Sequence, residues 1–268
     1  METYKLVADE SQIREFYEKV LAPLQEDESY FFALSARHKK LTEEERKEYL
    51  LGRAEMFGKQ FVRLDSEGNT IDHIISAIYK YECNKKAYVT KNGKPYPDKT
   101  LVLYGSINPS SDSECVAESM KYAVQVLTEM MMAAKKGSMN GIKDNISKFS
   151  RTHVKTKENH PHLPSRKIFM DFDADVTIPE EIEYEFFEDI KKRLTEKLKY
   201  TPTIIRTAGG FHTIVKKEYI KFNPAEIVET INDVASNYGI VSSEIKKNDN
   251  NMVPIPGTYQ YGVPVYMV

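Results

Sequence analysis

The sequence predicts an α+β protein, and three patterns in its C-terminal part carry that prediction. Residues 168–175 alternate apolar and acidic side chains, as a strand with one buried face does. Residues 203–215 hold two apolar runs joined by Thr207-Ala208-Gly209-Gly210, which predicts a hairpin. Helices are predicted over residues 179–199 and 223–239, because each range begins with a proline near the first helical position.

Together these elements predict the order β-α-β-β-α-β over residues 165–268, with the last strands near residues 254–258 and 263–267. This order is the split βαβ pattern, known as ferredoxin-like or RRM-like, in which the first and third strands are neighbours. Residues 1–164 are predicted to form an N-terminal αβ module that ends in a polar junction over residues 137–164. The two modules are expected to form one compact domain.

The N-terminal module is predicted to begin with a helix over residues 9–22, followed by a buried strand from Tyr30 to Ser35. The helix has apolar residues at helical spacing, namely Ile13, Phe16, Tyr17 and Val20. Thr42 and Glu45 form a capping box, which predicts a second helix reaching about Phe57.

The middle of the chain is less regular, and residues 73–81 fit either a helix or a strand. Asn92-Gly93 predicts a turn, and residues 101–107 predict a strand. A capping box at Ser111 and Glu114 predicts a helix to about Lys136. Its apolar residues share one side, namely Val116, Met120, Val124, Leu127 and Met131. The run from Met130 to Met132 is interpreted as packing material rather than a ligand site.

Composition sets outer limits on function. The 268 residues carry a formal net charge of −2, so a nucleic-acid partner would require basic residues that are gathered locally. Cys83 and Cys115 do not make a disulfide framework. No apolar run approaches the ~20 residues that span a bilayer, and no signal peptide is visible. We expect a soluble intracellular protein that is not secreted and has no membrane partner.

The strand over residues 168–175 is the strongest candidate site. Asp171, Asp173 and Asp175 are two residues apart and therefore share a face. Clustered carboxylates favour a hard divalent cation such as Mg²⁺ or Mn²⁺, and the alternative is a solvated acidic strand end. In the predicted topology His212 lies on the neighbouring strand and faces the acidic pair. The turn at Gly209 and Gly210 lets the backbone approach a bulky anion.

Two further clusters have both a functional and an ordinary interpretation. Arg37, Lys39 and Lys40 could bind phosphates of a nucleic acid or form a solvated turn. His153, His160 and His162 are most simply a surface loop. The His160-x-His162 pair also resembles that of rolling-circle replication endonucleases, but Pro161 and Pro164 argue against the strand that pair requires.

Three segments in order resemble motifs of the archaeo-eukaryotic primase superfamily. Phe169-Met170-Asp171-Phe172-Asp173 resembles the first motif, hydrophobic-Asp-hydrophobic-Asp. Gly209-Gly210-Phe211-His212 resembles the second, small-x-His after a glycine-rich hairpin. Val253-Pro254-Ile255-Pro256-Gly257-Thr258 resembles the Pro-Gly-Ser/Thr segment that follows the third motif, although members often have arginine where this chain has Pro254.

The resemblance implies a primase or primase-polymerase that copies single-stranded DNA, such as viruses or mobile elements encode. Asp171 and Asp173 would hold two Mg²⁺ or Mn²⁺ ions, and His212 would contact the phosphates of the incoming nucleoside triphosphate. The third acid is unassigned among Glu244, Asp249 and Asp175, with Glu244 taken as the metal ligand. Further nucleotide-binding residues are expected from the same part of the chain, namely Arg206, Gly209, Gly210 and Lys216.

Several alternatives stay open. The chain has no phosphate-cradling Gly-x-x-x-x-Gly-Lys-Ser/Thr motif, so unwinding would come from a separate helicase. One rival function is the rolling-circle endonuclease, and another is a non-catalytic nucleic-acid-binding replication module. The sequence leaves open whether NTPs or dNTPs are used, and whether synthesis begins without a primer.

Overall fold

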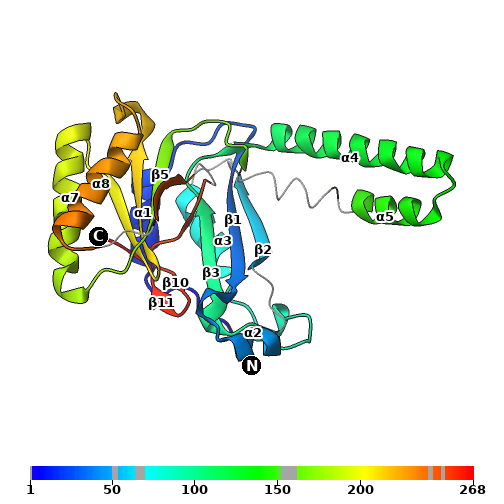
Figure 1. The fold of residues 1–268 in the computed structure, drawn as a ribbon, viewed down its shortest axis with the longest axis horizontal. Coiled ribbons are helices and arrows are strands. Elements are labelled where there is room, and N and C mark those ends of the chain that lie inside the picture. The colour runs from blue at the N-terminus through cyan, green and yellow to red at the C-terminus, as the bar shows by residue number, and fades with distance from the viewer. Residues whose placement is uncertain are drawn as a thin grey trace.

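The protein contains two antiparallel sheets with helices packed against them, which confirms the predicted α+β class (Figure 1). The computed structural model describes residues 2–49, 54–63, 70–150, 152, 162–240, 244–248 and 251–268. For residues 54–57 and 244 only the backbone is described. No helix in these ranges is both long and apolar enough to cross a bilayer.

The first sheet has the order β11-β10-β3-β1-β2, with β4 also paired to β1 and β9 to β3. Its central strand β1 is buried along almost its whole length, as the apolar run from Tyr30 predicts. Helices α1 and α3 pack against this sheet through apolar side chains that join its core. The elements are α1 (Glu10–Val20), β1 (Glu28–Arg37), β2 (Ala54–Arg63), α3 (Thr70–Tyr79), β3 (Leu101–Ser106), β4 (Ser110–Ser111), β9 (Met252–Pro254), β10 (Tyr259–Gln260) and β11 (Val263–Pro264).

The second sheet has the order β12-β6-β7-β5-β8 and is covered on one face by α7 and α8 (Figure 1). The chain runs β5, α7, β6, β7, α8, β8, which is the predicted β-α-β-β-α-β order, and β5 and β7 are neighbours as expected. The elements are β5 (Phe169–Asp175), α7 (Glu183–Leu198), β6 (Thr203–Thr207), β7 (Gly210–Lys216), α8 (Ala225–Asn237), β8 (Glu244–Asn248) and β12 (Tyr266–Met267).

The opposite face of the second sheet packs on the first module. Phe169, Ile205 and Ile214 come from three different strands of the second sheet and join the same core as α1, α3 and β1. On β5 the next residues along the strand, including Phe172 and Ala174, point instead toward α7 and α8. This alternation therefore directs the acidic side chains of β5 into the space between the two sheets.

The strand predicted near residues 254–258 was wrong in position, whereas β11 and β12 lie within the predicted range 263–267. The fourth strand of the β-α-β-β-α-β unit is β8, which begins ten residues before the expected range and pairs with β5. Strand β9 pairs with β3 of the first sheet, and β12 alone returns to the second sheet. Proline cannot donate to a ladder, so Pro254 and Pro256 disfavour an inner strand there. The division at residues 164 and 165 therefore does not separate the two sheets.

Two predicted elements in the N-terminal module also differ. Helix α2 (Glu43–Tyr49) has the predicted capping box, in which the backbone N–H of Thr42 donates to Glu45 at 2.8 Å, but it ends well before Phe57. Residues 54–63 form β2, because pairing along the buried β1 outweighs their local helical preference. The ambiguous residues 73–81 are mostly helical and belong to α3.

Helices α4 (Asp112–Lys135) and α5 (Met139–Ser150) form a hairpin that projects from the body of the protein (Figure 1). Residues 139–150 were predicted as part of an irregular junction, and this was wrong. Their spacing of apolar residues at 139, 142, 146 and 149 is helical. Ser138 accepts a hydrogen bond from the N–H of Gly141 and so caps α5.

The methionine run of α4 was predicted to be packing material, but Met131 and Met132 face solvent, as does the apolar side of this helix. Its side chains are 37% to 62% exposed, among them Val116, Met120, Val124, Leu127 and Met131. Met132 is exposed as well. The buried side of α4 is instead formed by the smaller residues Cys115, Ser119 and Ala123, together with Val126.

Candidate functional site

The acids of the candidate site are aligned by the ladder between β5, β7 and β8. Asp173 lies opposite His212 on β7 and Lys246 on β8, and Asp171 lies opposite Asn248 on β8. Side chains at paired positions share a face of the sheet. The structure thus brings Asp171, Asp173 and His212 together, as predicted from the sequence.

Asp171 and His212 form a buried pair. The Nδ1 atom of His212 lies 2.8 Å from Oδ2 of Asp171, and Asn248 donates to the same oxygen at 2.7 Å. Burial disfavours the charged imidazole, but the neighbouring Asp171 carboxylate outweighs it and raises the pKa of His212. The pair therefore favours an imidazolium that is held in one orientation.

Asp173 occupies the open side of this pair. Its Oδ1 lies 3.6 Å from Nε2 of His212, and its side chain is 37% exposed whereas that of Asp171 is fully buried. Burial raises the pKa of Asp173, and the adjacent Asp171 adds to this, while His212 and Lys246 act in the opposite direction. Asp173 is thus the acid that a ligand in solution can reach.

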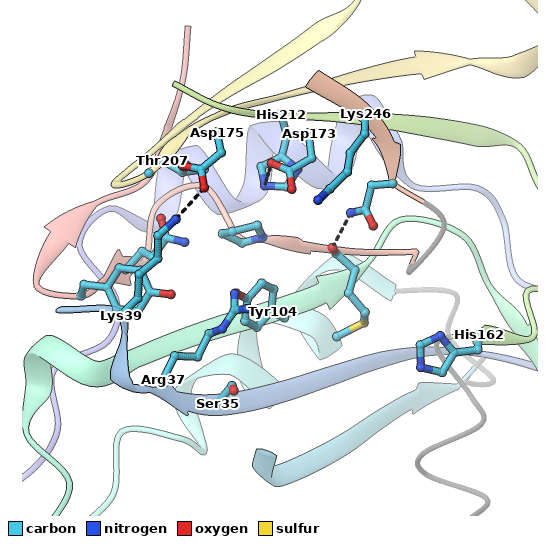
Figure 2. Close-up of a pocket in the computed structure, with 16 residues that line it drawn as sticks. Ser35, Arg37, Lys39, Tyr104, His162, Asp173, Asp175, Thr207, His212 and Lys246 are labelled. Atoms are coloured by element: carbon cyan, nitrogen blue, oxygen red, sulfur yellow. Dashed lines mark hydrogen bonds and ion pairs between the residues drawn. The ribbon is translucent and has the colours of Figure 1, made fainter. Parts of the chain in front are cut away.

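Asp173 and His212 line a cleft of about 430 Å³ between the two sheets (Figure 2). Three cations surround the acids, with Arg37 and Lys39 from the first module and Lys246 from β8. Figure 2 shows Asp173, His212 and Lys246 on one wall and Arg37 with Tyr104 on the facing wall. The cleft is within the size range of sites for small organic ligands, and its cations favour an anionic one.

The facing wall is held by hydrogen bonds. Arg37 donates to the hydroxyl of Tyr104 at 2.9 Å, and burial raises the pKa of Tyr104 to about 12, so this tyrosine is neutral. Gln260 accepts from the backbone N–H of Ala208 at 2.8 Å and thereby fixes the turn of the β6–β7 hairpin above the cleft.

The Gly209-Gly210 turn lies close to β5 and to the cleft. Gly210 has φ +151°, and a Cβ there would lie 1.9 Å from the backbone oxygen of Ala174. Gly209 lines the cleft beside Lys39, which forms an ion pair with Asp175 at 2.9 Å. Both groups of that ion pair are half exposed, so it is weak and can be displaced.

Other predicted site residues lie elsewhere. Arg206 points to the helical face of the sheet, where it forms an ion pair with Glu183 at 2.9 Å. Lys216 lies at the far end of β7 and does not line the cleft. Lys40 does not line it either, whereas His162 does, at the end away from His212 (Figure 2).

The predicted third acid is not settled by the described side chains. Glu244 pairs with Asp175 in the ladder through its backbone, and its side chain is not described. Asp249, like His153 and His160, lies outside the described residues. The positions on β8 beside Asp171 and Asp173 hold an amide and a cation, Asn248 and Lys246.

Several residues of the cleft were missed in the sequence, chiefly Lys246, Asn248, Tyr104, Gln260 and Tyr261. The alternation of Glu244, Lys246 and Asn248 is a weak strand signal that could have identified the strand beside the acids. Tyr104 and Tyr261 enter the cleft only because strands far apart in sequence pair, so no local pattern marks them.

The donor set offers a partial fit to a divalent cation. In the described part of the chain no three His, Cys, Asp or Glu side chains are arranged as a metal site. However, Oδ1 of Asp171 is buried and accepts no hydrogen bond from the residues described. Mg²⁺ is commonly bound by one or two carboxylates together with substrate phosphates, and Asp171 with Asp173 could supply these carboxylates.

Comparison with known proteins places the chain in no family. It matches no family model, no curated protein and no solved structure.

Proposed function

We propose that the cleft binds a nucleoside triphosphate with divalent cations and catalyses nucleotidyl transfer on a single-stranded DNA template, as a primase or primase-polymerase. One observation carries this proposal: Asp171, Asp173 and His212 converge on one sheet face, where Asp173 and His212 line a cleft whose other charged groups are largely cationic. Carboxylates would hold Mg²⁺ or Mn²⁺, which when bound neutralise phosphate charge and activate a 3′-hydroxyl.

The chain's own residues divide the remaining work. His212, kept charged and oriented by Asp171, would donate from Nε2 to a phosphate oxygen. Lys39, Lys246 and Arg37 would attract the triphosphate to the cleft. In the transfer the 3′-oxygen bonds to the α-phosphorus, the bond to the bridging oxygen breaks, pyrophosphate leaves and the hydroxyl proton passes to solvent.

A second candidate function is a nucleic-acid-binding module without catalysis. Lys246 and Asn248 favour it, because they occupy the two positions on β8 where a further acid could complete the metal site. Such a module would bind nucleotide or DNA and be indifferent to the loss of the acids.

The rolling-circle endonuclease is less well supported. Of its histidine pair, His162 lines the cleft and His160 lies outside the described residues. Burial raises the pKa of the nearby Tyr104 and Tyr261, which disfavours either of them as a nucleophile.

The test is nucleotide incorporation on single-stranded DNA, with and without an annealed primer, with labelled NTPs or dNTPs and with Mg²⁺ or Mn²⁺. We expect metal-dependent product that falls at least ~100-fold in Asp173→Asn and His212→Gln. Asp233→Asn on α8, on the helical side of the sheet, is the matched control and should retain activity. Absence of product with every metal, while DNA still binds, would establish the non-catalytic module instead.

A further inference from the structure

A groove rich in lysine adjoins the cleft on the far side of Asp171. Two neighbouring hollows of about 230 Å³ and about 610 Å³ form it. They share Lys167, Phe169 and Lys217 in their walls, so they are adjacent. Lys247 lines the smaller hollow and Lys216 the larger one. We call this surface, defined by Lys167, Lys216, Lys217 and Lys247, the lysine groove.

The lysine groove is connected to the candidate site through Asp171 and Asn248. Asn248 lines both the cleft and the smaller hollow, and its side chain donates to Asp171. Asp171 lines the smaller hollow, and its Oδ1 is the buried oxygen that accepts no hydrogen bond from the described residues. A ligand lying along the lysine groove would therefore end beside the Asp171–His212 pair.

Although the chain as a whole carries a formal net charge of −2, four lysines line the groove. Its only described carboxylates are Asp171, which is buried against His212, and Glu218, which lies 3.5 Å from Lys216. Arg166 also lines the larger hollow, where Glu28 pairs with it. The backbone N–H of Lys217 donates to the oxygen of Ile168 at 2.8 Å, which keeps two lysine-bearing segments side by side.

We propose that the lysine groove binds the phosphate backbone of a single-stranded DNA whose end lies in the cleft. Lysine ammonium groups attract phosphates without reading sequence, as a strand-guiding path requires. Two hollows in series suit a chain of phosphates better than one isolated anion. The inference rests on the proposed function and adds to it the path by which the strand approaches the acids.

The experiment is fluorescence anisotropy of a labelled oligodeoxythymidine over a KCl series, without nucleotide. We expect Lys167→Gln/Lys217→Gln/Lys247→Gln to weaken binding at least ~10-fold. The slope of log affinity against log salt is negative and should become less steep by about 2, since each of three lost phosphate contacts on a single strand contributes ~0.7. The corresponding triple Lys→Arg variant keeps the charge and should bind like the unsubstituted protein.

The matched control is Lys191→Gln/Lys192→Gln/Lys197→Gln on α7, which covers the other face of the sheet and removes the same charge. It should change the affinity less than ~2-fold. Equal weakening by both triple glutamine variants would show that only net charge matters and would overturn the proposal, as would unchanged binding by the groove variant. Incorporation is scored separately: if wild-type protein makes no product but the groove variant loses DNA binding, the proposed function fails and the groove stands.

Discussion

At the scale of single residues, the site is governed by the difference between two carboxylates two positions apart. Asp171 is enclosed, accepts a hydrogen bond from Asn248 and contacts His212, whereas Asp173 faces the cleft. The same strand therefore supplies one acid that orients and charges a histidine and one that is accessible to a ligand. Titratable groups with different surroundings and different pKa shifts, placed side by side, are typical of functional sites.

The Asp171–His212 pair makes a prediction about pH. Because the pKa of His212 is raised above its ordinary value of 6.5, the pair stabilises the fold fully below that pH, and this contribution is lost as pH rises through the raised pKa. In Asp171→Asn the buried imidazole loses its counter-charge, so its pKa should fall. The loss of stability on substitution should be about 1–3 kcal/mol in the acid range and smaller at alkaline pH.

Urea unfolding in metal-free buffer between mildly acidic and alkaline pH checks this. The double variant Asp171→Asn/His212→Gln, compared with His212→Gln alone, is the control, and their difference in unfolding free energy should not vary with pH. If the unfolding free energies of the wild-type protein and Asp171→Asn differed by the same amount at every pH, the pair would carry no pH-dependent stabilisation.

At the scale of elements, the β6–β7 hairpin is positioned by its contact with β5. Gly210 begins β7 opposite Asp175, and its missing side chain lets the hairpin backbone approach Ala174. Its φ of +151° is also one that residues with a Cβ rarely adopt. The turn therefore sets the register in which His212, two residues later, lies opposite Asp173.

We predict that Gly210→Ala costs about 3 kcal/mol of unfolding free energy, from backbone strain and from the clash with Ala174. Gly262→Ala is the matched control, because Gly262 also has a positive φ of +79° but nothing lies within 4 Å of a Cβ there. It should cost only about 1 kcal/mol. Chemical denaturation measures both, and similar losses for the two variants would mean that the close approach to β5 is unimportant.

The sequence allowed the local elements around the site to be predicted, because each has a short-range signal. The alternation around Asp171, the glycine turn before His212, the capping box at Thr42 and the N-cap at Ser111 are all present in the structure. The predictions that were wrong depend on long-range pairing: the start of β2, up to Phe57, was predicted as helix, and β9 was assigned to the second sheet. Such pairings have no local pattern, and the spacing of apolar residues in α4 does not reveal that this side of the helix faces solvent.

At the scale of the whole molecule, the cleft exists because the chain crosses between its two sheets more than once. It leaves the first sheet after β4, builds the second from β5 to β8, returns through β9, β10 and β11, and ends in the second sheet at β12. The residues of the facing wall, such as Tyr261, therefore come from the C-terminal segment as well as from the N-terminal module. The relative position of the sheets decides whether the cations face the acids.

Asn108 is a central link between the sheets. It follows β3, is buried, and its Oδ1 accepts from the backbone N–H groups of Ile168 and Phe169, both at 2.8 Å. Its side-chain amide donates to the oxygen of Phe169 at 3.0 Å and to Asn251 at 2.8 Å. One side chain thus connects the end of β3, the start of β5 and the segment that leads into β9.

We predict that Asn108→Ala lowers the unfolding free energy by about 2–4 kcal/mol, because it leaves buried backbone groups without partners. The amides of Ile168 and Phe169 should also exchange faster with solvent deuterium. Amides in the centre of β7 should change their exchange rate only by the amount that the loss of global stability causes. Asn92→Ala, in the exposed turn, is the control and should change stability by less than ~1 kcal/mol. If Asn108→Ala were as mild, or left the exchange at Ile168 unchanged, the link between the sheets would have to be sought in their shared core around Phe169, Ile205 and Ile214.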